Sequence, residues 1–300
     1  VLNRDAGRWF ARKGLLEEAV RHFLKAGDTH AAVELIRNNR YALMNTSQFA
    51  RLSRLMAALP EDILANDPHM LTTRALLGTD VGKNIDLYAF TRKAAQMLAG
   101  LSPESGSYPE IKGEVFVLQS LLDMLANDAK SGLSHGGQAL EFLPENALLA
   151  KSLCVFALCV CHQMTGNIGK ANEVVRRALS NPFHPANIRG RMQICLSFAQ
   201  YLDANLPGVI AISEKCLEAT KDTQAPHTKA YANYLIGLAN YMLDNLESAE
   251  HFLLKIIRDK YSLNPSYFSD SGYLLVSIYL AQGRESEAEQ MMDELGEHGR

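Results

Sequence analysis

The residues best suited to chemistry form an aromatic series with one arginine, in four segments of the C-terminal two-thirds. Within each segment they recur at three- or four-residue steps, which places them on one face of a helix. Tyrosine offers a ring face and a hydroxyl, and Arg191 would anchor an anionic group, so the series suits a small organic ligand. The predicted ligand-binding residues are Gln163, Arg191, Phe198, Tyr201, Tyr231, Tyr234, Tyr241, Asp270 and Tyr273, and Phe156, Val160, Ile194, Leu238 and Ser277 share these faces.

The same spacing is also typical of tyrosines that pack between repeats with the hydroxyl directed to solvent, and the sequence leaves both interpretations open. For the other reactive side chains, the cysteines and histidines, the sequence favours packing in the core over a functional role more strongly. A metal site on one helix is conceivable from Cys154, Cys161 and His162, but Cys159 points away from Cys154 on such a helix. We therefore expect buried thiols at Cys154, Cys159, Cys161, Cys195 and Cys216, and core or boundary packing at His22, His162 and His251.

Motifs of catalysis are absent from the sequence. It contains neither a G-x-S-x-G elbow nor an H-E-x-x-H pair, and neither Gly82-Lys83 nor Gly169-Lys170 continues into a phosphate-binding loop. We expect no catalytic residue, no metal and no cofactor in these residues. An enzyme would be indicated only by a turnover that depends on Asp270 or His162.

Composition narrows the class of protein. The 300 residues contain 30 Lys and Arg against 33 Asp and Glu, with a net charge of -3, and 47% are hydrophobic. A near-neutral balance argues against a nucleic-acid surface, and the longest apolar run, residues 153–161, is about half the ~18 residues that span a bilayer. We expect a cytoplasmic protein without membrane contact. Because the chain starts at Val1 and helical patterning runs almost to both ends, we also expect a fragment of a longer protein.

Helices must position these residues, because apolar residues recur at three- and four-residue steps and alternating strand patterns are lacking. Five helix starts share a small or equivalent residue after a polar turn, at spacings of 39, 38, 40 and 39 residues: Gly132, Ala171, Val209, Ala249 and Ala288. A small side chain lets two antiparallel helices approach closely, and hairpins that cannot bury both apolar faces stack. The sequence predicts an all-α fold, a right-handed α-solenoid superhelix of antiparallel helix hairpins with lengthened tetratricopeptide-like (TPR-like) repeats.

The N-terminal part follows a related pattern, with Gly7, Phe10, Gly14, Ala19 and Phe23 at tetratricopeptide positions and Asn3 in place of the usual tryptophan. We expect the boundary between two subdomains in the polar stretch of residues 100–109. We predict N-terminal helical repeats over residues 1–100 and a TPR-like superhelical sensor domain over residues 110–300.

Two N-terminal segments, LNRDAGRWF at 2–10 and GLLEEAVRHFLKAGD at 14–28, resemble the region after the nucleotide-binding and winged-helix modules of the large ATP-dependent LuxR-type transcription activators, the MalT-like family. The segments LMAALPEDIL at 55–64, PHML at 68–71 and Arg74-Ala75 resemble the next helices of that family. The likeness covers residues 1 to about 80, and the rest matches only as a repeat pattern.

This resemblance implies a sensor arm, whose superhelix binds a small inducer or a regulatory protein and controls a nucleotide-dependent switch. Partners would be that effector and other domains of the same regulator, with ATP and DNA chemistry outside these residues. The alternative is a generic TPR-like scaffold that binds a peptide or partner protein without a small-molecule effector.

Overall fold

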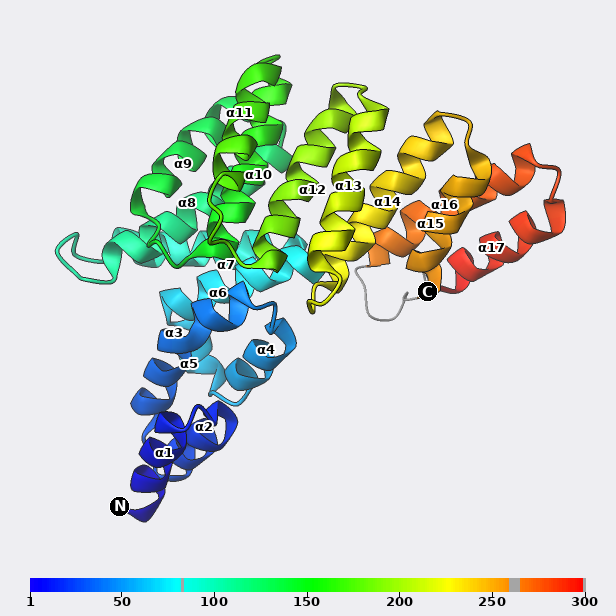
Figure 1. Ribbon diagram of the computed structural model, residues 1–300. Coiled ribbons are helices and arrows are strands. Elements are labelled where there is room, and N and C mark those ends of the chain that lie inside the picture. The colour runs from blue at the N-terminus through cyan, green and yellow to red at the C-terminus, as the bar shows by residue number, and fades with distance from the viewer. Residues whose placement is uncertain (82–83, 259–264, 299–300) are drawn as a thin grey trace. The chain divides into compact units, whose positions relative to one another are not determined.

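The computed structural model describes residues 1–81, 84–258 and 265–298 (Figure 1). The Gly82-Lys83 pair lies outside these residues. In the described ranges the chain forms seventeen helices and no strand, which confirms the predicted all-α solenoid. Two compact units share the chain: unit 1 comprises residues 1–79 and 83–154, and unit 2 comprises residues 80–82 and 155–300. The predicted division near residues 100–109 stays a prediction.

Unit 1 is built from helices that pack on their neighbours in the chain, among them the pairs α1 with α2 and α8 with α9. Close approach of α1 and α2 depends on Gly7, because a Cβ atom there would lie 2.7 Å from the ring of Phe23. Its helices are α1 (Leu2–Arg12), α2 (Leu16–Lys25), α3 (Thr29–Asn45), α4 (Phe49–Ala57), α5 (Glu61–Ala65), α6 (Pro68–Val81), α7 (Asn84–Ala99), α8 (Tyr108–Leu125), α9 (Ala129–Phe142) and the start of α10 (Leu148–Met164).

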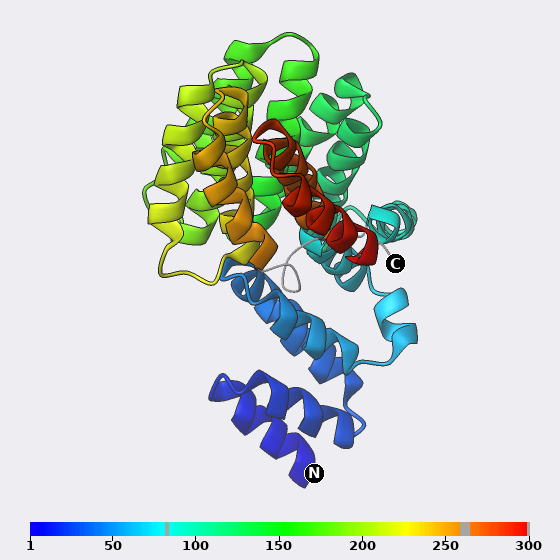
Figure 2. The ribbon, with the colours of Figure 1, turned by 90° about the vertical axis from the view of Figure 1, so that its right-hand side faces the viewer.

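Unit 2 continues as helix hairpins, in which α13 packs on α12, α15 on α14 and α17 on α16. The first helices also contact one another, α12 with α14 and α14 with α16, so successive hairpins lie side by side (Figures 1 and 2). Apolar clusters fill the space between them and contain the small residues Ala171, Val209 and Ala249. The remaining helices are α11 (Ile168–Leu179), α12 (Ala186–Leu202), α13 (Leu206–Thr220), α14 (Pro226–Met242), α15 (Leu246–Arg258), α16 (Pro265–Ala281) and α17 (Glu285–His298).

The predicted repeat is visible in the turns of the hairpins. Five turn residues adopt a left-handed backbone with φ between 56° and 74°, again 38 to 40 residues apart: Asn127, Gly166, Ala204, Asp244 and Gly283. The amide after each turn residue donates to a carbonyl of the preceding helix at 2.8 to 2.9 Å, a bond that satisfies an otherwise unpaired helix end. Each hairpin therefore uses the same helix stop.

Ala204 is the least favourable residue for this turn, because its Cβ atom disfavours the φ of 56° that it adopts. We expect Ala204→Gly to raise the free energy of unfolding by about 1 kcal/mol. Ala211→Gly, inside the exposed face of α13, is the matched control and should lower that free energy by about 1 kcal/mol. Urea denaturation followed by circular dichroism measures the free energy of unfolding of both variants. If both substitutions change that free energy in the same direction, the strain assigned to Ala204 is contradicted.

All five cysteines are buried and free, which confirms the predicted buried thiols. Burial raises the pKa of Cys154, Cys159 and Cys216 to about 12, and it raises the pKa of Cys195 as well. In the described part of the chain, no group of three or more His, Cys, Asp or Glu side chains is arranged to hold a metal ion. None of the described helices combines the length and apolar character needed to cross a bilayer.

Unit 1 also buries a polar network that joins three helices. Arg40 of α3 is 1% exposed, and its guanidinium donates to Glu114 of α8 at 2.7 Å and to Thr73 of α6 at 3.0 Å. Glu110, one turn before Glu114, also accepts from Arg40. His69 of α6 lies beside the network, and its burial lowers its pKa, as does the nearby Arg40. The network fixes the relative positions of α3, α6 and α8.

Candidate functional site

The nine predicted ligand-binding residues all lie on the first helices of the hairpins in unit 2, namely α10, α12, α14 and α16. We call them the aromatic stripe. Asp270 and Tyr273 of α16 are exposed, and the other seven are half-buried: Gln163, Arg191, Phe198, Tyr201, Tyr231, Tyr234 and Tyr241. The stripe is therefore continuous with the packed interior while keeping part of its surface accessible.

Ring contacts bring four of the nine stripe residues into two groups. Phe198 lies between Phe156 and Tyr201, with ring centroids 5.9 and 6.1 Å away. Tyr231 and Tyr234 stack at 6.0 Å. The first group joins α10 to α12, and the second belongs to α14.

Tyr267 extends the second group, with its ring centroid 5.7 Å from that of Tyr231. Sequence reasoning missed it, although it precedes Asp270 by three residues on the same helix and a longer projection of the helical face would have found it. At the other end, Tyr273 is 57% exposed and makes no ring contact within the described ranges.

The tyrosines of α14 are held in their neutral form. Burial raises the pKa of Tyr234 to about 12, with smaller contributions from Asp270 and Tyr201. Burial likewise raises the pKa of Tyr231, assisted by Tyr267 and Tyr234. Partial desolvation of the Asp270 carboxyl group, whose residue is exposed overall, also raises its pKa. At neutral pH these hydroxyls are therefore hydrogen-bond donors beside a carboxylate.

Much of the stripe also packs the interior. Phe198, Tyr201, Tyr231 and Tyr234 contact the apolar cluster between α12, α13 and α14, and Tyr241 contacts the next cluster. The packing interpretation therefore holds for the inner edges of these rings, and ligand binding by their outer faces stays a prediction.

Gln163 contributes a polar group at one end of the stripe. Its Nε2 donates to the carbonyl of Ala199 at 3.0 Å, which ties α10 to α12. Its Oε1 is buried and accepts no hydrogen bond within the described residues. A buried acceptor without a donor is unfavourable, so a ligand hydroxyl that reached it would be stabilised.

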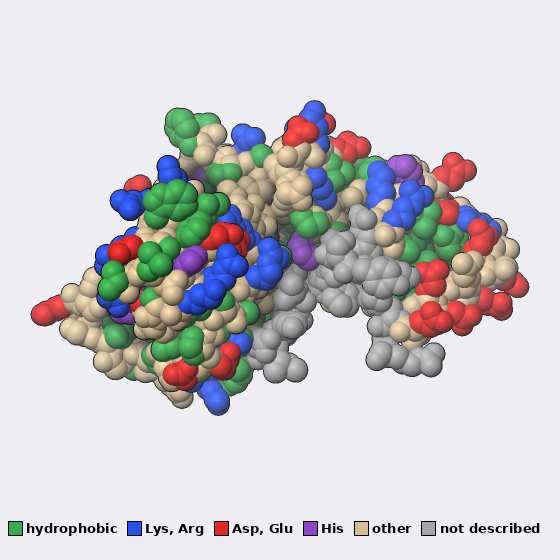
Figure 3. Space-filling model, turned by 90° about the horizontal axis from the view of Figure 1, so that it is seen from below, with side chains coloured by type: hydrophobic (Ala, Val, Ile, Leu, Met, Phe, Trp, Pro, Cys, Tyr) green, Lys and Arg blue, Asp and Glu red, His purple; other side chains and the backbone are tan. Residues whose placement is uncertain are grey.

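Acidic side chains gather at the C-terminal end of unit 2. The helix α17 carries Glu285, Glu287, Glu289, Asp293 and Glu297 on its exposed surface. Figure 3 shows acidic side chains, in red, with basic ones among them at the right-hand end of the view. Arg284 pairs with Glu250 and Glu287, so it neutralises only part of the charge. The surface is predominantly negative.

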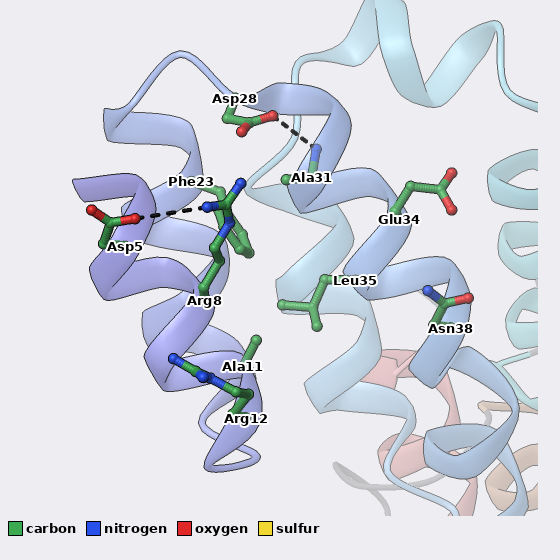
Figure 4. Close-up of a pocket in the computed structure, with 10 residues that line it drawn as sticks. All are labelled: Asp5, Arg8, Ala11, Arg12, Phe23, Asp28, Ala31, Glu34, Leu35 and Asn38. Carbon is green, nitrogen blue, oxygen red and sulfur yellow. Dashed lines mark hydrogen bonds and ion pairs between the residues drawn. The ribbon is translucent and has the colours of Figure 1, made fainter. Parts of the chain in front are cut away.

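A large cavity in unit 1, which sequence reasoning did not predict, lies among α1, α2 and α3 (Figure 4). It measures about 840 Å³, and Phe23 and Leu35 supply apolar surface. Its charged groups are largely paired: Arg8 lies 3.7 Å from Asp5, and Asp28 accepts from the amide of Ala31 at 3.2 Å. Asp5, Arg8, Phe23 and Asp28 of the lining come from the segments that carry the N-terminal resemblance.

Comparison with known protein families shows which family this chain is similar to. Residues 113–300 match the family model of the MalT-like TPR region. The chain belongs to the MalT-like TPR family. The match starts within α8, whereas the motifs that suggested the family lie before residue 80, so the two lines of support come from different parts of the chain.

One solved structure agrees with the fold. A signal transduction ATPase with numerous domains (STAND) from Pyrococcus horikoshii, which carries a tetratricopeptide repeat sensor, superposes over 93% of this chain with a TM-score of 0.63 and 15% identity. The MalT-like chain spans 42% of that protein. The TPR domain of P58(IPK) aligns over 99% of this chain and 92% of its own, with 10% identity and a TM-score of 0.32. The first likeness shows the fold alone.

Proposed function

We propose that this chain is the non-catalytic, cytoplasmic sensor region of a LuxR-type transcriptional regulator, and that the aromatic stripe binds its small inducer. The observation that carries the proposal is a half-buried row of aromatic rings with one arginine, located inside the MalT-like TPR region. The protein from Pyrococcus combines an ATPase with a repeat sensor, which supports the same division of tasks here.

The chemistry of the stripe defines the inducer that it would accept. Ring faces of Phe198, Tyr201 and Tyr234 suit an apolar or planar body, and the neutral hydroxyls suit hydrogen-bond acceptors. Arg191 would bind an anionic or polar group. Binding of this kind needs no cofactor.

Nucleotide and DNA chemistry belong, in this proposal, to other domains of the regulator. The acidic surface of α17 supports that assignment, because negative side chains repel a phosphate backbone (Figure 3). Nucleic-acid-binding surfaces are usually strongly basic.

A thermal melting screen against a metabolite library tests the proposal. A ligand at about 100 times its dissociation constant stabilises the native state by about 2.7 kcal/mol, and a shift confined to part of the melting curve is compatible with repeat unfolding. We expect Arg191→Gln and Tyr234→Phe to abolish the shift of a specific hit. The matched control Arg177→Gln, on the exposed face of α11, should leave it unchanged. Unaltered binding by both stripe variants would reject the site.

A second candidate function is the capture of a peptide from a regulatory protein. The 840 Å³ cavity of unit 1 favours it, because apolar surface beside charges of both signs suits a peptide chain. The test is a peptide added to each variant. A peptide that raises the melting temperature of Arg191→Gln and Tyr234→Phe, but not that of Arg8→Gln, would support this function over inducer binding at the stripe.

A further inference from the structure

A second cavity of unit 1, of about 540 Å³, lies between α7, α8 and α9. One face of α7 lines it with Tyr88 and Arg92, which are four residues apart, and α8 lines it with Gln119 and Asp123. His135 of α9 completes the polar lining. The cavity has the volume of a small-molecule site, and it is separate from the aromatic stripe in its residues.

Arg92 brings a positive charge to the cavity lining, which also contains the carboxylate of Asp123. Its side chain is exposed, and it forms neither an ion pair nor a hydrogen bond with the residues that the structure describes. A guanidinium without a carboxylate partner is a good anchor for a phosphate or carboxylate group.

Gln119 adds an acceptor that lacks a donor. Its Oε1 is buried, and no described residue donates a hydrogen bond to it. Leaving a buried acceptor unpaired is unfavourable, and a hydroxyl group in the cavity would remove that cost.

The Asp123–His135 pair is positioned to add a further acceptor. Nδ1 of His135 lies 2.6 Å from a carboxylate oxygen of Asp123, and this hydrogen bond orients the ring. The second carboxylate oxygen of Asp123 is an acceptor for a hydroxyl group in the cavity. Acceptors beside a cation favour a ligand with hydroxyls and one anionic group.

We propose that this cavity binds a small hydroxylated anion, a sugar phosphate or a sugar acid. Arg92 holds the anionic group, and Gln119 with the Asp123–His135 pair accepts from the hydroxyls. Tyr88, whose side chain is 59% exposed, offers its ring to the apolar face of the sugar. The site would give the chain a second ligand, bound in unit 1.

Isothermal titration of the 300-residue chain tests the proposal, with glucose 6-phosphate, gluconate, glucose and inorganic phosphate as probes. We expect saturable binding of at least one of the two acids, and glucose and phosphate should each bind about tenfold more weakly or worse. Arg92→Gln and Gln119→Leu should each weaken the acid by about tenfold or more. Arg54→Gln, an exposed arginine of α4, is the control and should bind like the parent chain.

Stability measurements separate binding from folding. Gln119→Leu removes a buried unpaired acceptor, so it should preserve or raise the melting temperature while it weakens binding. The proposal is overturned if neither acid binds saturably, or if Arg92→Gln binds like the parent chain. It is also overturned if inorganic phosphate binds as tightly as glucose 6-phosphate. Loss of acid binding in Arg191→Gln, with Arg92→Gln unaffected, would assign the ligand to the aromatic stripe.

Discussion

Arg40→Met should lower the free energy of unfolding by about 3–5 kcal/mol, the largest effect expected for a single substitution in this chain. Arg40 and Glu114 are 1% and 0% exposed, and their side chains meet at 2.7 Å. Methionine fills most of the space of the arginine stem, so cavity formation contributes little. The loss comes from leaving Glu114 charged and buried without its cation.

The surrounding hydrogen bonds explain why Glu114 cannot relax. Its oxygens also accept from the hydroxyl of Thr72 at 2.6 Å and from that of Tyr41 at 2.9 Å. These bonds hold the carboxylate in the interior between α3, α6 and α8. Burial, and then the charge of Glu114, raise the pKa of Tyr41, so its phenol stays a donor.

A double-mutant cycle measures the coupling. Glu114→Gln removes the charge and keeps an acceptor for one of the two hydroxyls, of Thr72 and Tyr41, while its amide NH2 can donate to the other. Adding it to Arg40→Met should therefore recover a large part of the lost stability. Urea denaturation followed by circular dichroism provides the free energies, and hydrogen exchange in α3, α6 and α8 shows where the loss occurs. Strict additivity, or a loss below about 1 kcal/mol for Arg40→Met, would contradict the buried network.

Gly113→Ala should lower the free energy of unfolding by about 1–3 kcal/mol, although replacing glycine by alanine inside a helix normally gains about 0.5–1 kcal/mol. The added Cβ atom would lie 2.9 Å from the backbone nitrogen of Leu143 and 3.1 Å from the carbonyl carbon of Phe142. Backbone atoms cannot rotate away, so α8 and the end of α9 would have to separate.

Gly137→Ala is the matched control on the same hairpin. A Cβ atom at Gly137 meets nothing within 4 Å, and the residue lies on the exposed side of α9. We expect a gain of about 0.5–1 kcal/mol, because only the helix preference changes. We expect the melting temperature to fall for Gly113→Ala and to rise for Gly137→Ala. A rise for Gly113→Ala would show that α8 and the end of α9 are not in close contact at this residue.

The repeat architecture was accessible from the sequence because it depends on local features. Ala171, Ala249 and the turn residues recur at a regular spacing, and each small residue is buried where two helices of a hairpin approach. The burial of the cysteines follows from the same helical periodicity. Both predictions are confirmed.

The polar sites were not accessible in the same way. Arg40 and Glu114 are 74 residues apart, and neither stands in a motif that predicts its partner. The cavity around Arg92 depends on how α7 packs on the α8–α9 hairpin, which periodicity does not determine. For the aromatic stripe the helical faces were predicted from spacing, but the ring contacts, including the one with Tyr267, depend on the rotation between hairpins.

The burial of every native thiol has a practical consequence for following the sensor in solution. Maleimide dyes react with exposed thiolates, and the five sulfhydryls are inaccessible in the folded chain. Ser277→Cys, on the exposed side of α16, would therefore be labelled selectively without a cysteine-free background. The emission of a single fluorophore there would test the proposed ligand binding at unit 2 in the otherwise wild-type polypeptide.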